Sequence, residues 1–362
     1  RQVRALAKKN KTEYVSFLGG GVYNKFIPAC ISQVAQRFEF LTAYTPYQPE
    51  ISQGTLQVMY EFQTMICELT GMDISNATVY DAATACAEAI LMAVRISKKS
   101  KALVSNRLNP EYKSVVKTYA WASDIELEWF DEIPANTADY ACVLIQNPDY
   151  YGEINEIQPV DTLLIIATDV SSLSILKPPA QYGADIVVGD VQGLGIPMEF
   201  GGPHAGFIAC REKFMRQMPG RLAGRTVDAD GNQAFCLTIQ TREQHIKREK
   251  ATSNICSNQA LIGLCATLYL SLMGKKGFYQ AGYLSTKKAH ELSEKLAAKG
   301  IKTLNKNFFN EFVIEVADAD KFLSRLKENN ILGGIKIDNT HILVAVTEMT
   351  TDEDIELYIA NV

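Results

Sequence analysis

The residues best placed to do chemistry are polar side chains at the ends of predicted strands and helices. Asp169 ends the apolar run LLIIATD, and a second run, ADIVVGDVQGLG, ends near Asp190, two residues before Gln192. Asp81 and Thr84 stand at the entrance of a predicted helix, where backbone amides can bind a phosphate. A carboxylate at that place instead caps the helix and takes the positive end that a phosphate needs. Strand-ending aspartates commonly bind turn amides, so local capping is also an alternative role for Asp169.

A second group of candidates lies in the proline-punctuated segment AYTPYQPEISQ, ahead of another predicted helix. Side chains in such a loop can project toward a neighbouring subunit. One interpretation is that they contact a ligand there, and the other is that the tyrosines and Glu50 only hold an interface together. The candidates are Tyr44, Tyr47, Gln48, Glu50 and Gln53.

The basic stretch from Arg242 to Lys250 is interleaved with Glu243 and Glu249, which favours a solvated or internally paired helix face. The alternative is a docking surface for an acidic protein. His204 and Cys256 have no evident partner base, so core or turn roles are predicted for both. The basic members of the stretch are Arg242, His245, Lys247, Arg248 and Lys250.

The composition narrows the class of protein before the motifs are combined. With 362 residues, 47% hydrophobic, the chain can bury a sizeable core, and its net charge of -5 gives no field that would attract nucleic acid or an anionic membrane. The eight cysteines include no CxxC pair and the histidines show no ligand spacing, so no metal site is predicted. Reduced, mostly buried thiols favour the cytoplasm or an organelle matrix. The start at Arg1, inside a helical pattern, suggests that residues precede it.

Helical patterns and short apolar runs then alternate along the chain, which indicates a mostly parallel sheet covered by helices. Helices are predicted over residues 55–69, stopped by Gly71, and over 82–96, while Pro110 opens a third. Four short runs are too apolar to have one solvent-exposed face and are predicted to be buried strands: KALVS, ACVLIQN, TLLIIATD and ADIVVGD. The run GFIAC could form a strand that returns antiparallel to them. Only six residues separate Glu156 from the strand at Leu163, so either that connection is not parallel or residues have been omitted.

The remaining sequence predicts a smaller unit after the sheet. Two long helical patterns, residues 259–273 and 277–299, precede strands in NEFVIEV and HILVAV and helices over 319–329 and 351–360. We therefore divide the chain into an N-terminal helical and loop segment (1–54), a large domain (55–273) and a small C-terminal α+β domain (274–362).

Four blocks of the sequence resemble the glycine cleavage system P-protein family, and within it the N-terminal half that many bacteria make as a separate subunit 1. They are AYTPYQPEISQGTLQ, GLGIPMEFGGPHAGF, MPGRLAGRTVDADG and TREQHIKREKATSNICSNQAL. The resemblance implies the α/β fold of aspartate aminotransferase, the pyridoxal-phosphate-dependent transferase fold type I, with a smaller C-terminal α+β domain. In that fold an Asp ending one strand pairs with the pyridine nitrogen, a role that Asp169 fits.

The same resemblance places Gln192 where the catalytic half of the family carries its Schiff-base lysine. An amide cannot form that imine, and the nearest substitute, Lys177, lies in LKPPA, a predicted surface turn. The vestigial cofactor pocket would comprise Asp81, Thr84, Asp169 and Gln192, with no catalytic residue and no pyridoxal phosphate in this chain. The cofactor is expected in the partner subunit.

The family reaction implied by the resemblance is decarboxylation of glycine, with transfer of the aminomethyl group to the lipoyl arm of H-protein. The expected partners are a pyridoxal-phosphate-bearing subunit 2, in an α2β2 assembly, and lipoylated H-protein. The loop from Tyr44 to Gln53 would line the entrance of the partner's active site. Two alternatives remain: a purely structural partner, and an independent pyridoxal enzyme that uses an unexpected lysine.

Overall fold

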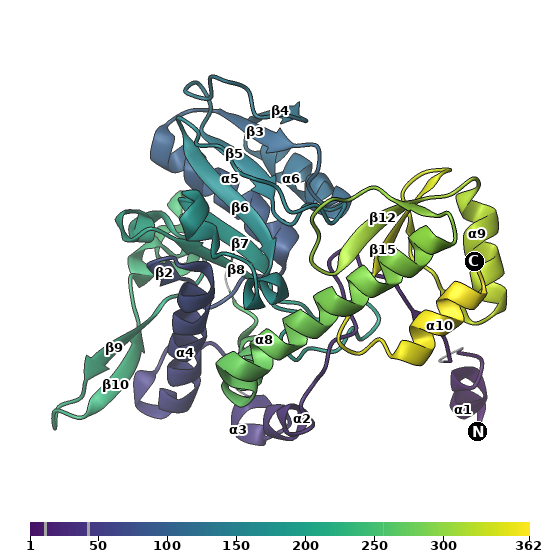
Figure 1. Cartoon of the computed structure of the whole chain (residues 1–362). Helices are drawn as coiled ribbons and strands as arrows, with labels where there is room; N and C mark the ends of the chain where they lie inside the picture. Colours follow the sequence, from purple (N-terminus) through teal and green to yellow (C-terminus); the bar gives the residue numbers. More distant parts are fainter. Residues whose placement is uncertain (11–12, 42–43, 256) are drawn as a thin grey trace.

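A seven-stranded mixed sheet forms the centre of the computed structural model, which describes all residues except 11–12, 42–43 and 256 (Figure 1). Ala43 and Cys256 therefore lie outside the described residues. Five strands are parallel, and β8 runs antiparallel to them, as expected for GFIAC. The edge strand β2 pairs antiparallel with β8 and so runs in the direction of the other five. The order is β2 (Ile74–Ser75), β8 (Gly206–Cys210), β7 (Ile186–Asp190), β6 (Leu163–Asp169), β5 (Cys142–Gln146), β3 (Lys101–Ser105) and β4 (Glu126–Phe130).

Helices cover both faces of this sheet, which explains why its central strands are apolar throughout. On one face α5 (Ala82–Ser97) packs on β5 to β8, and α6 (Pro110–Ala122) packs on α5. On the other face α4 (Gln53–Thr70), α2 (Cys30–Ala35) and the first part of α8 (Ala260–Ala298) share a second core with the sheet. The predicted stop at Gly71 is confirmed, since this residue ends α4 with φ of 72°. Pro110 opens α6 as expected.

The connection between β5 and β6 differs from our expectation. The two strands are parallel, with Cys142 opposite Leu163, so the hypothesis of a non-parallel connection is wrong. No helix forms between them; the intervening chain instead reaches the small domain, where Glu153 bridges Phe308. A parallel connection normally needs a covering helix, and here contact with a second domain takes its place.

A four-stranded antiparallel sheet forms the small domain, in the order β11 (Lys302–Thr303), β12 (Glu311–Glu315), β15 (His341–Ala345) and β14 (Ile335–Lys336). Helices α9 (Ala319–Glu328) and α10 (Asp352–Ala360) pack with the second part of α8 into its core. The two helical patterns predicted before this domain meet in α8 at a kink, Gly274. Near the N-terminus, β1 (Val15–Ser16) pairs with β13 (Ile331–Leu332) beside this sheet.

Shorter elements complete the chain. A hairpin of β9 (Ala223–Val227) and β10 (Gln233–Leu237) extends from the large sheet, and α1 (Gln2–Ala7) stands apart near the N-terminus (Figure 1). The others are α3 (Phe38–Leu41), α7 (Gln244–Lys247) and six 3₁₀ helices, η1 (Pro49–Ile51), η2 (Val170–Ser174), η3 (Pro179–Tyr182), η4 (Glu212–Gln217), η5 (Gln240–Arg242) and η6 (Arg248–Lys250).

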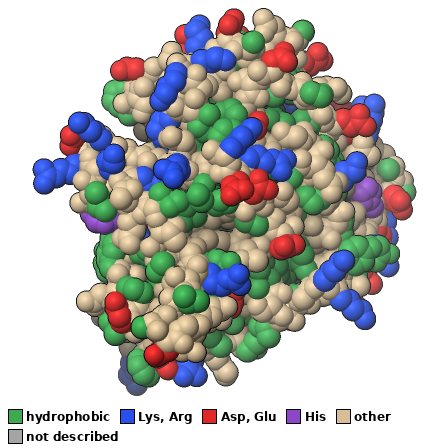
Figure 2. Space-filling view, turned by 90° about the vertical axis from the view of Figure 1, so that its left-hand side faces the viewer, with side chains coloured by type: hydrophobic (Ala, Val, Ile, Leu, Met, Phe, Trp, Pro, Cys, Tyr) green, Lys and Arg blue, Asp and Glu red, His purple; other side chains and the backbone are tan. Residues whose placement is uncertain are grey.

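The side of the molecule that carries this hairpin shows both signs of charge among its hydrophobic side chains (Figure 2). Such a mixture lacks the single-sign field that would draw in a polyanion. Among the described residues, no helix has the length and apolar character needed to cross a membrane.

Candidate functional site

Gln192 follows the central strand β7 and is buried, with 1% of its surface exposed. Its side-chain oxygen accepts a hydrogen bond from the backbone N–H of Tyr23 at 2.9 Å. Its side-chain nitrogen donates to the carbonyl oxygens of Tyr23 at 3.0 Å and Ile196 at 2.9 Å. Every hydrogen-bonding group of this amide is therefore used within the chain, and the residue ties the N-terminal segment to the sheet.

Two carboxylates occupy the N-terminus of α5. Asp81 accepts the backbone N–H of Thr84 at 2.7 Å, as the predicted cap requires, and Asp190 accepts that of Ala82 at 3.3 Å. Burial raises the pKa of Asp190, and its contact with the imidazole of His204, 3.3 Å away, opposes that rise. These bonds use amides that would otherwise face a bound phosphate. A dianion at this helix end would also meet two negative charges.

Asp169 ends β6 as predicted and caps the turn that follows. Its carboxylate accepts the backbone N–H of Ser171 at 2.9 Å and the hydroxyl of the same residue at 2.6 Å. Both oxygens thus have local partners, which is the arrangement of an ordinary Asx turn. The carboxylate nevertheless faces the same cavity as Asp190 and Gln192.

Two tyrosines fill the space between these groups. Tyr23 and Tyr112 line a cavity of only about 30 Å³ together with Asp169, Asp190 and Gln192. A second cavity, of about 20 Å³, is lined by Tyr23, Asp169 and Glu311 among others. Burial, followed by the charge of Asp190, raises the pKa of Tyr112, so this phenol stays neutral. Sites for small molecules and cofactors usually measure about 300–1,000 Å³, so the space left here suits a water molecule.

Two buried ionisable residues beside this site were not predicted from the sequence. Glu311 of β12 accepts the N–H of Gly20 at 2.6 Å and the hydroxyl of Tyr23 at 2.7 Å, and burial raises its pKa to about 7. Lys25 has 4% of its side chain exposed and lies 3.4 Å from the carboxylate of Glu348. Neither residue stands in a recognisable motif. The only available signal was a polar residue within an apolar stretch of the chain.

The structure separates the predicted loop from this site. Gln53 binds the carbonyl oxygens of Pro49 and Phe235 and accepts the N–H of Phe235, so its amide has a packing role. Tyr47 accepts a hydrogen bond from Arg221 at 2.8 Å. Tyr44 has 75% of its surface exposed, and Gln48 and Glu50 are exposed as well. The loop therefore has an anchored part and an open part.

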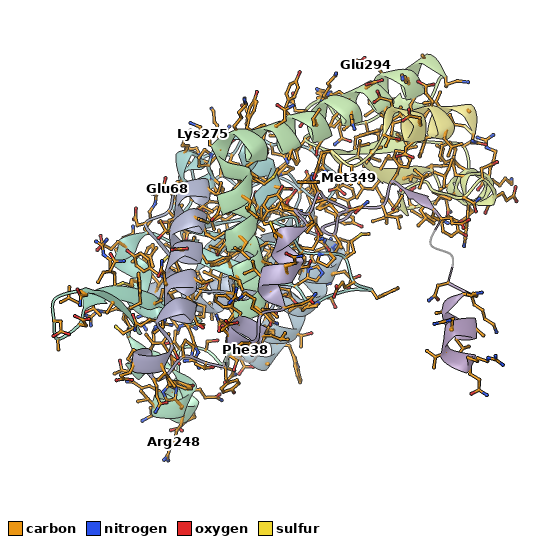
Figure 3. All side chains as sticks on the ribbon, turned by 90° about the horizontal axis from the view of Figure 1, so that it is seen from below. Phe38, Glu68, Arg248, Lys275, Glu294 and Met349 are labelled. Carbon is orange, nitrogen blue, oxygen red and sulfur yellow. The ribbon has the colours of Figure 1, made fainter. Side chains whose placement is uncertain are left out.

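The basic stretch is not one helix face, since it forms three short helices, η5, α7 and η6. Arg242 is buried and donates to backbone oxygens of Met218 and Gly220, so it does not belong to an exposed surface. The later basic residues, from His245 to Lys250, are exposed. Figure 3 labels Arg248 at the outer edge of the molecule.

His204 and Lys177 are two further residues with roles expected from the sequence. His204 does have a partner: its imidazole meets Asp190, and this contact raises the histidine pKa, so our view of it as a lone residue is wrong. The sequence could not show that the turn after β7 returns to that carboxylate. Lys177 is exposed beside the turn at Pro178 and Pro179, as expected.

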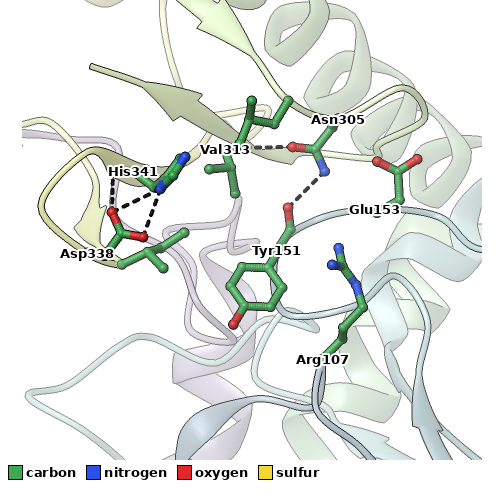
Figure 4. Close-up of a pocket in the computed structure, with 9 residues that line it drawn as sticks. Arg107, Tyr151, Glu153, Asn305, Val313, Asp338 and His341 are labelled. Carbon is green, nitrogen blue, oxygen red and sulfur yellow. Dashed lines mark hydrogen bonds and ion pairs between the residues drawn. The ribbon is translucent and has the colours of Figure 1, made fainter. Parts of the chain in front are cut away.

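A cleft of about 380 Å³ opens beside the small domain (Figure 4). It shares no lining residue with the cavity at Gln192. Its charged side chains are held by local partners: Arg107 binds Asp149, and His341 lies 2.8 Å from the carboxylate of Asp338. The carboxylate of Glu153 binds two backbone amides of the small domain. Of these contacts, the bonds of Glu153 join the two domains, and none of them points to a particular ligand.

Metal binding and disulfide chemistry have no visible basis in the described part of the chain. No cluster of three potential metal ligands occurs there. The seven described cysteines are free, and burial raises the pKa of the Cys142 thiol to about 12. Four of these seven cysteines are buried, in agreement with the mostly buried thiols that we expected, and Cys30 is exposed.

Comparison with known proteins gives matches along the whole chain. The model of a family described as "Glycine cleavage system P-protein" matches residues 1–362. A probable glycine dehydrogenase (decarboxylating) subunit 1 of Geobacillus thermodenitrificans (strain NG80-2) is 45% identical over 389 residues, covering 99% of this chain and 86% of that protein. A protein of the same description from Carboxydothermus hydrogenoformans (strain ATCC BAA-161 / DSM 6008 / Z-2901) is 47% identical over 380 residues, covering 97% and 85%.

Solved structures agree with these matches. A crystal structure of glycine decarboxylase (P-protein) of the glycine cleavage system, in inhibitor-bound form, superposes with a TM-score of 0.93 at 39% identity, covering 100% of this chain and 88% of that one. Lactobacillus brevis CGMCC 1306 glutamate decarboxylase superposes with a TM-score of 0.71 at 10% identity, covering 99% and 90%, which shows the fold alone. The expected pyridoxal-phosphate-dependent transferase fold is confirmed.

The alignment with the Geobacillus protein is longer than this chain. The match to the Geobacillus protein spans 389 positions, whereas this chain has 362 residues. That relative therefore carries residues within the matched region that this chain lacks.

Proposed function

Because this chain belongs to the glycine cleavage system P-protein family, we propose that it is the subunit of glycine dehydrogenase (decarboxylating) that holds no cofactor and works with a second subunit that does. The P-protein is a pyridoxal-phosphate enzyme, and the relatives at 44–47% identity are described as its subunit 1. The proposal assigns pyridoxal phosphate, and the decarboxylation of glycine that it supports, to the partner.

The observation that carries the proposal is the buried amide of Gln192. It stands two residues after β7, at the place that the family resemblance gives to the Schiff-base lysine, and a carboxamide cannot form the imine. The residues around it do not fit the cofactor either. Asp81 and Asp190 bind the helix amides that a phosphate would use, and Asp169 binds Ser171. We therefore derive no chemical step through a cofactor in this chain.

The direct test measures each chain alone and the reconstituted pair. We expect neither the glycine-dependent release of carbon dioxide nor a borohydride-fixed pyridoxyl group with this chain alone, and turnover only when a pyridoxal-bearing second subunit is added. Turnover, or a reduced pyridoxyl adduct on Lys25, Lys177 or any other lysine of this chain at one per subunit, would contradict the proposal.

The open part of the loop is the best candidate for a contribution to the partner's active site. Tyr44, Gln48 and Glu50 are exposed and make no described side-chain hydrogen bond, so they remain available to glycine or to the lipoyl arm of H-protein. The competing function is a purely structural subunit. The hydrogen bonds of Gln53 and Tyr47 within the chain favour a structural role for the anchored part of the loop.

Substitution of the exposed loop residues separates these two functions. Tyr44→Ala and Glu50→Gln in the reconstituted pair should lower turnover while assembly, measured by size-exclusion chromatography with light scattering, stays intact. Unchanged turnover in an intact assembly would favour the structural subunit. An α2β2 stoichiometry is part of the same proposal, and the same chromatography tests it.

A further inference from the structure

The strongest unexplained feature is the segment of residues 19–25, which we call the strap. It crosses between the two domains and lies against the cavity at Gln192. In Figure 1 the N-terminal part of the chain runs between the large sheet and the small domain. Nothing in the proposed function requires this placement.

The strap takes the space that a cofactor would need. Tyr23 is 5% exposed and lines two cavities, of about 30 and 20 Å³, which together are far below the usual size of a cofactor site. Tyr112 closes the side nearest the N-terminus of α5, where Asp190 and Asp81 act on its pKa. The phenol rings of these tyrosines thus fill the interior between the carboxylates.

The strap is bound to both domains. On the large domain, Gln192 holds both backbone groups of Tyr23, and Asn109 donates to the carbonyl of Gly20 at 2.9 Å. On the small domain, Glu311 accepts from Gly20 and from the hydroxyl of Tyr23.

Further contacts with the small domain follow at the end of the strap. Thr347 donates to the carbonyl of Asn24 at 2.7 Å, and Glu348 meets Lys25. Figure 3 labels Met349, the residue after Glu348, where the small domain meets the N-terminal segment.

The glycines of the strap are required by its close approach to the small domain. A Cβ at residue 19 would lie 2.2 Å from a carboxylate oxygen of Glu311, well inside contact distance. Gly20 and Gly21 have φ of 74° and 107°, in the region that side chains disfavour. The run Gly19 to Gly21 therefore lets the backbone lie against the buried carboxylate of Glu311.

We propose that the strap is a built-in occupant of the cofactor site, and that Tyr23 and Tyr112, in addition to the missing lysine, exclude pyridoxal phosphate from this subunit. The proposal rests on the proposed function, since it explains how a subunit of this fold stays free of cofactor. It makes Tyr23 and Tyr112 residues that determine cofactor specificity. It also makes the strap a clamp that fixes the small domain against the large one.

Restoring the lysine tests the proposal, because it removes only the chemical obstacle. Gln192→Lys should form no pyridoxyl adduct at residue 192 when the purified chain is incubated with pyridoxal phosphate, reduced with borohydride and mapped by peptide mass spectrometry. Gln192→Met is the matched control, since it loses the same hydrogen bonds and cannot form an imine. A one-to-one adduct at residue 192 in the lysine variant would overturn the proposal.

A second measurement on the unaltered chain covers the case in which these variants do not fold. The amides of Gly20 and Tyr23 should exchange with deuterium at least 100-fold slower than in an unstructured peptide, because Glu311 and Gln192 hold them. Addition of pyridoxal phosphate should not change their rates. Exchange at the unstructured rate, or a pyridoxal-dependent change in these amides, would overturn the proposal.

The outcomes also distinguish this proposal from the proposed function. An adduct in the unaltered chain contradicts the proposed function. An adduct confined to Gln192→Lys leaves the proposed function intact and overturns only the exclusion by Tyr23 and Tyr112.

Discussion

The cavity at Gln192 and the loop from Tyr44 to Glu50 are two polar regions with opposite character. Around Gln192 the carboxylates of Asp169 and Asp190 and the amide itself have partners within the chain. In the loop, Tyr44 is 75% exposed and the side chain of Glu50 makes no described hydrogen bond. The contrast teaches that the polar groups around Gln192 are part of the internal structure, whereas groups that can meet a ligand or a subunit face outward.

The largest expected effect comes from removing the amide at the centre of the closed region. Gln192→Ala leaves the backbone N–H and carbonyl of Tyr23 and the carbonyl of Ile196 buried without a partner. At about 1–3 kcal/mol for each unsatisfied buried group, we expect a loss of roughly 3–9 kcal/mol of unfolding free energy, measured by urea denaturation.

Gln57→Ala is the matched control for that substitution, because the amide of Gln57 is exposed on α4 and binds only Glu61. We expect its effect to stay within about 0.5 kcal/mol. Equal effects of the two substitutions would contradict the claim that the amide of Gln192 contributes more to stability than an exposed amide does.

Glu311 gives the next largest effect, as a pH dependence of stability. Burial raises its pKa from the usual 4.5 to about 7, so the folded state binds a proton that the unfolded state has released. The stabilisation of the folded state by this proton is fully present below about pH 4.5 and is lost as the pH rises to about 7. At 1.36 kcal/mol per pKa unit this loss is on the order of 3 kcal/mol.

The matched variant for this prediction is Glu311→Gln, which keeps the shape and can still bind Gly20 and Tyr23. The difference in unfolding free energy between the two proteins should change across pH 4.5–7 and be constant above it. The charged or titratable groups that face Glu311 are Tyr23, Lys25, Asp169 and Tyr150. A difference that is flat across the whole range would show that Glu311 does not bind the extra proton.

The anchored part of the loop should show an intermediate effect. Tyr47→Phe removes the hydroxyl that accepts from the buried Arg221 while the ring stays beneath the guanidinium, 4.8 Å from its centre. We expect a loss of about 1–2 kcal/mol of unfolding free energy by urea denaturation, since a hydrogen bond to a charged group is lost. A loss as large as that of Gln192→Ala would show that Tyr47 is as important to the internal structure as the buried amide of Gln192.

The open part of the loop should show the smallest effect on stability. Tyr44→Ala removes an exposed side chain, so the unfolding free energy of the isolated chain should change by less than about 0.5 kcal/mol. The expected consequence appears only in the reconstituted pair, as lower turnover. A clear loss of stability in the isolated chain would show that Tyr44 packs internally.

Much of the fold could be predicted from local patterns. The apolar runs became β5, β6 and β7, the cap at Asp81 and the stop at Gly71 are where the chemistry of these residues puts them, and the mostly parallel sheet follows from the alternation. The connection before β6 could not be predicted, because the chain there is held by the distant residue Phe308.

The candidate site was predictable only in part, for a similar reason. Asp81, Asp169, Asp190 and Gln192 converge because they sit at the ends of neighbouring elements, which sequence order reveals. Tyr23 and Glu311 are 288 positions apart and meet only after both domains have packed. His204 likewise meets Asp190 through a turn whose path no local pattern encodes.

The central claim is that this chain carries no pyridoxal phosphate and that its partner does. The most direct measurement is borohydride reduction of the reconstituted, active pair, followed by intact-mass and peptide mass spectrometry of each chain. The account predicts one reduced pyridoxyl group per partner subunit and none on this chain. A stoichiometric pyridoxyl group on a lysine of this chain would contradict it.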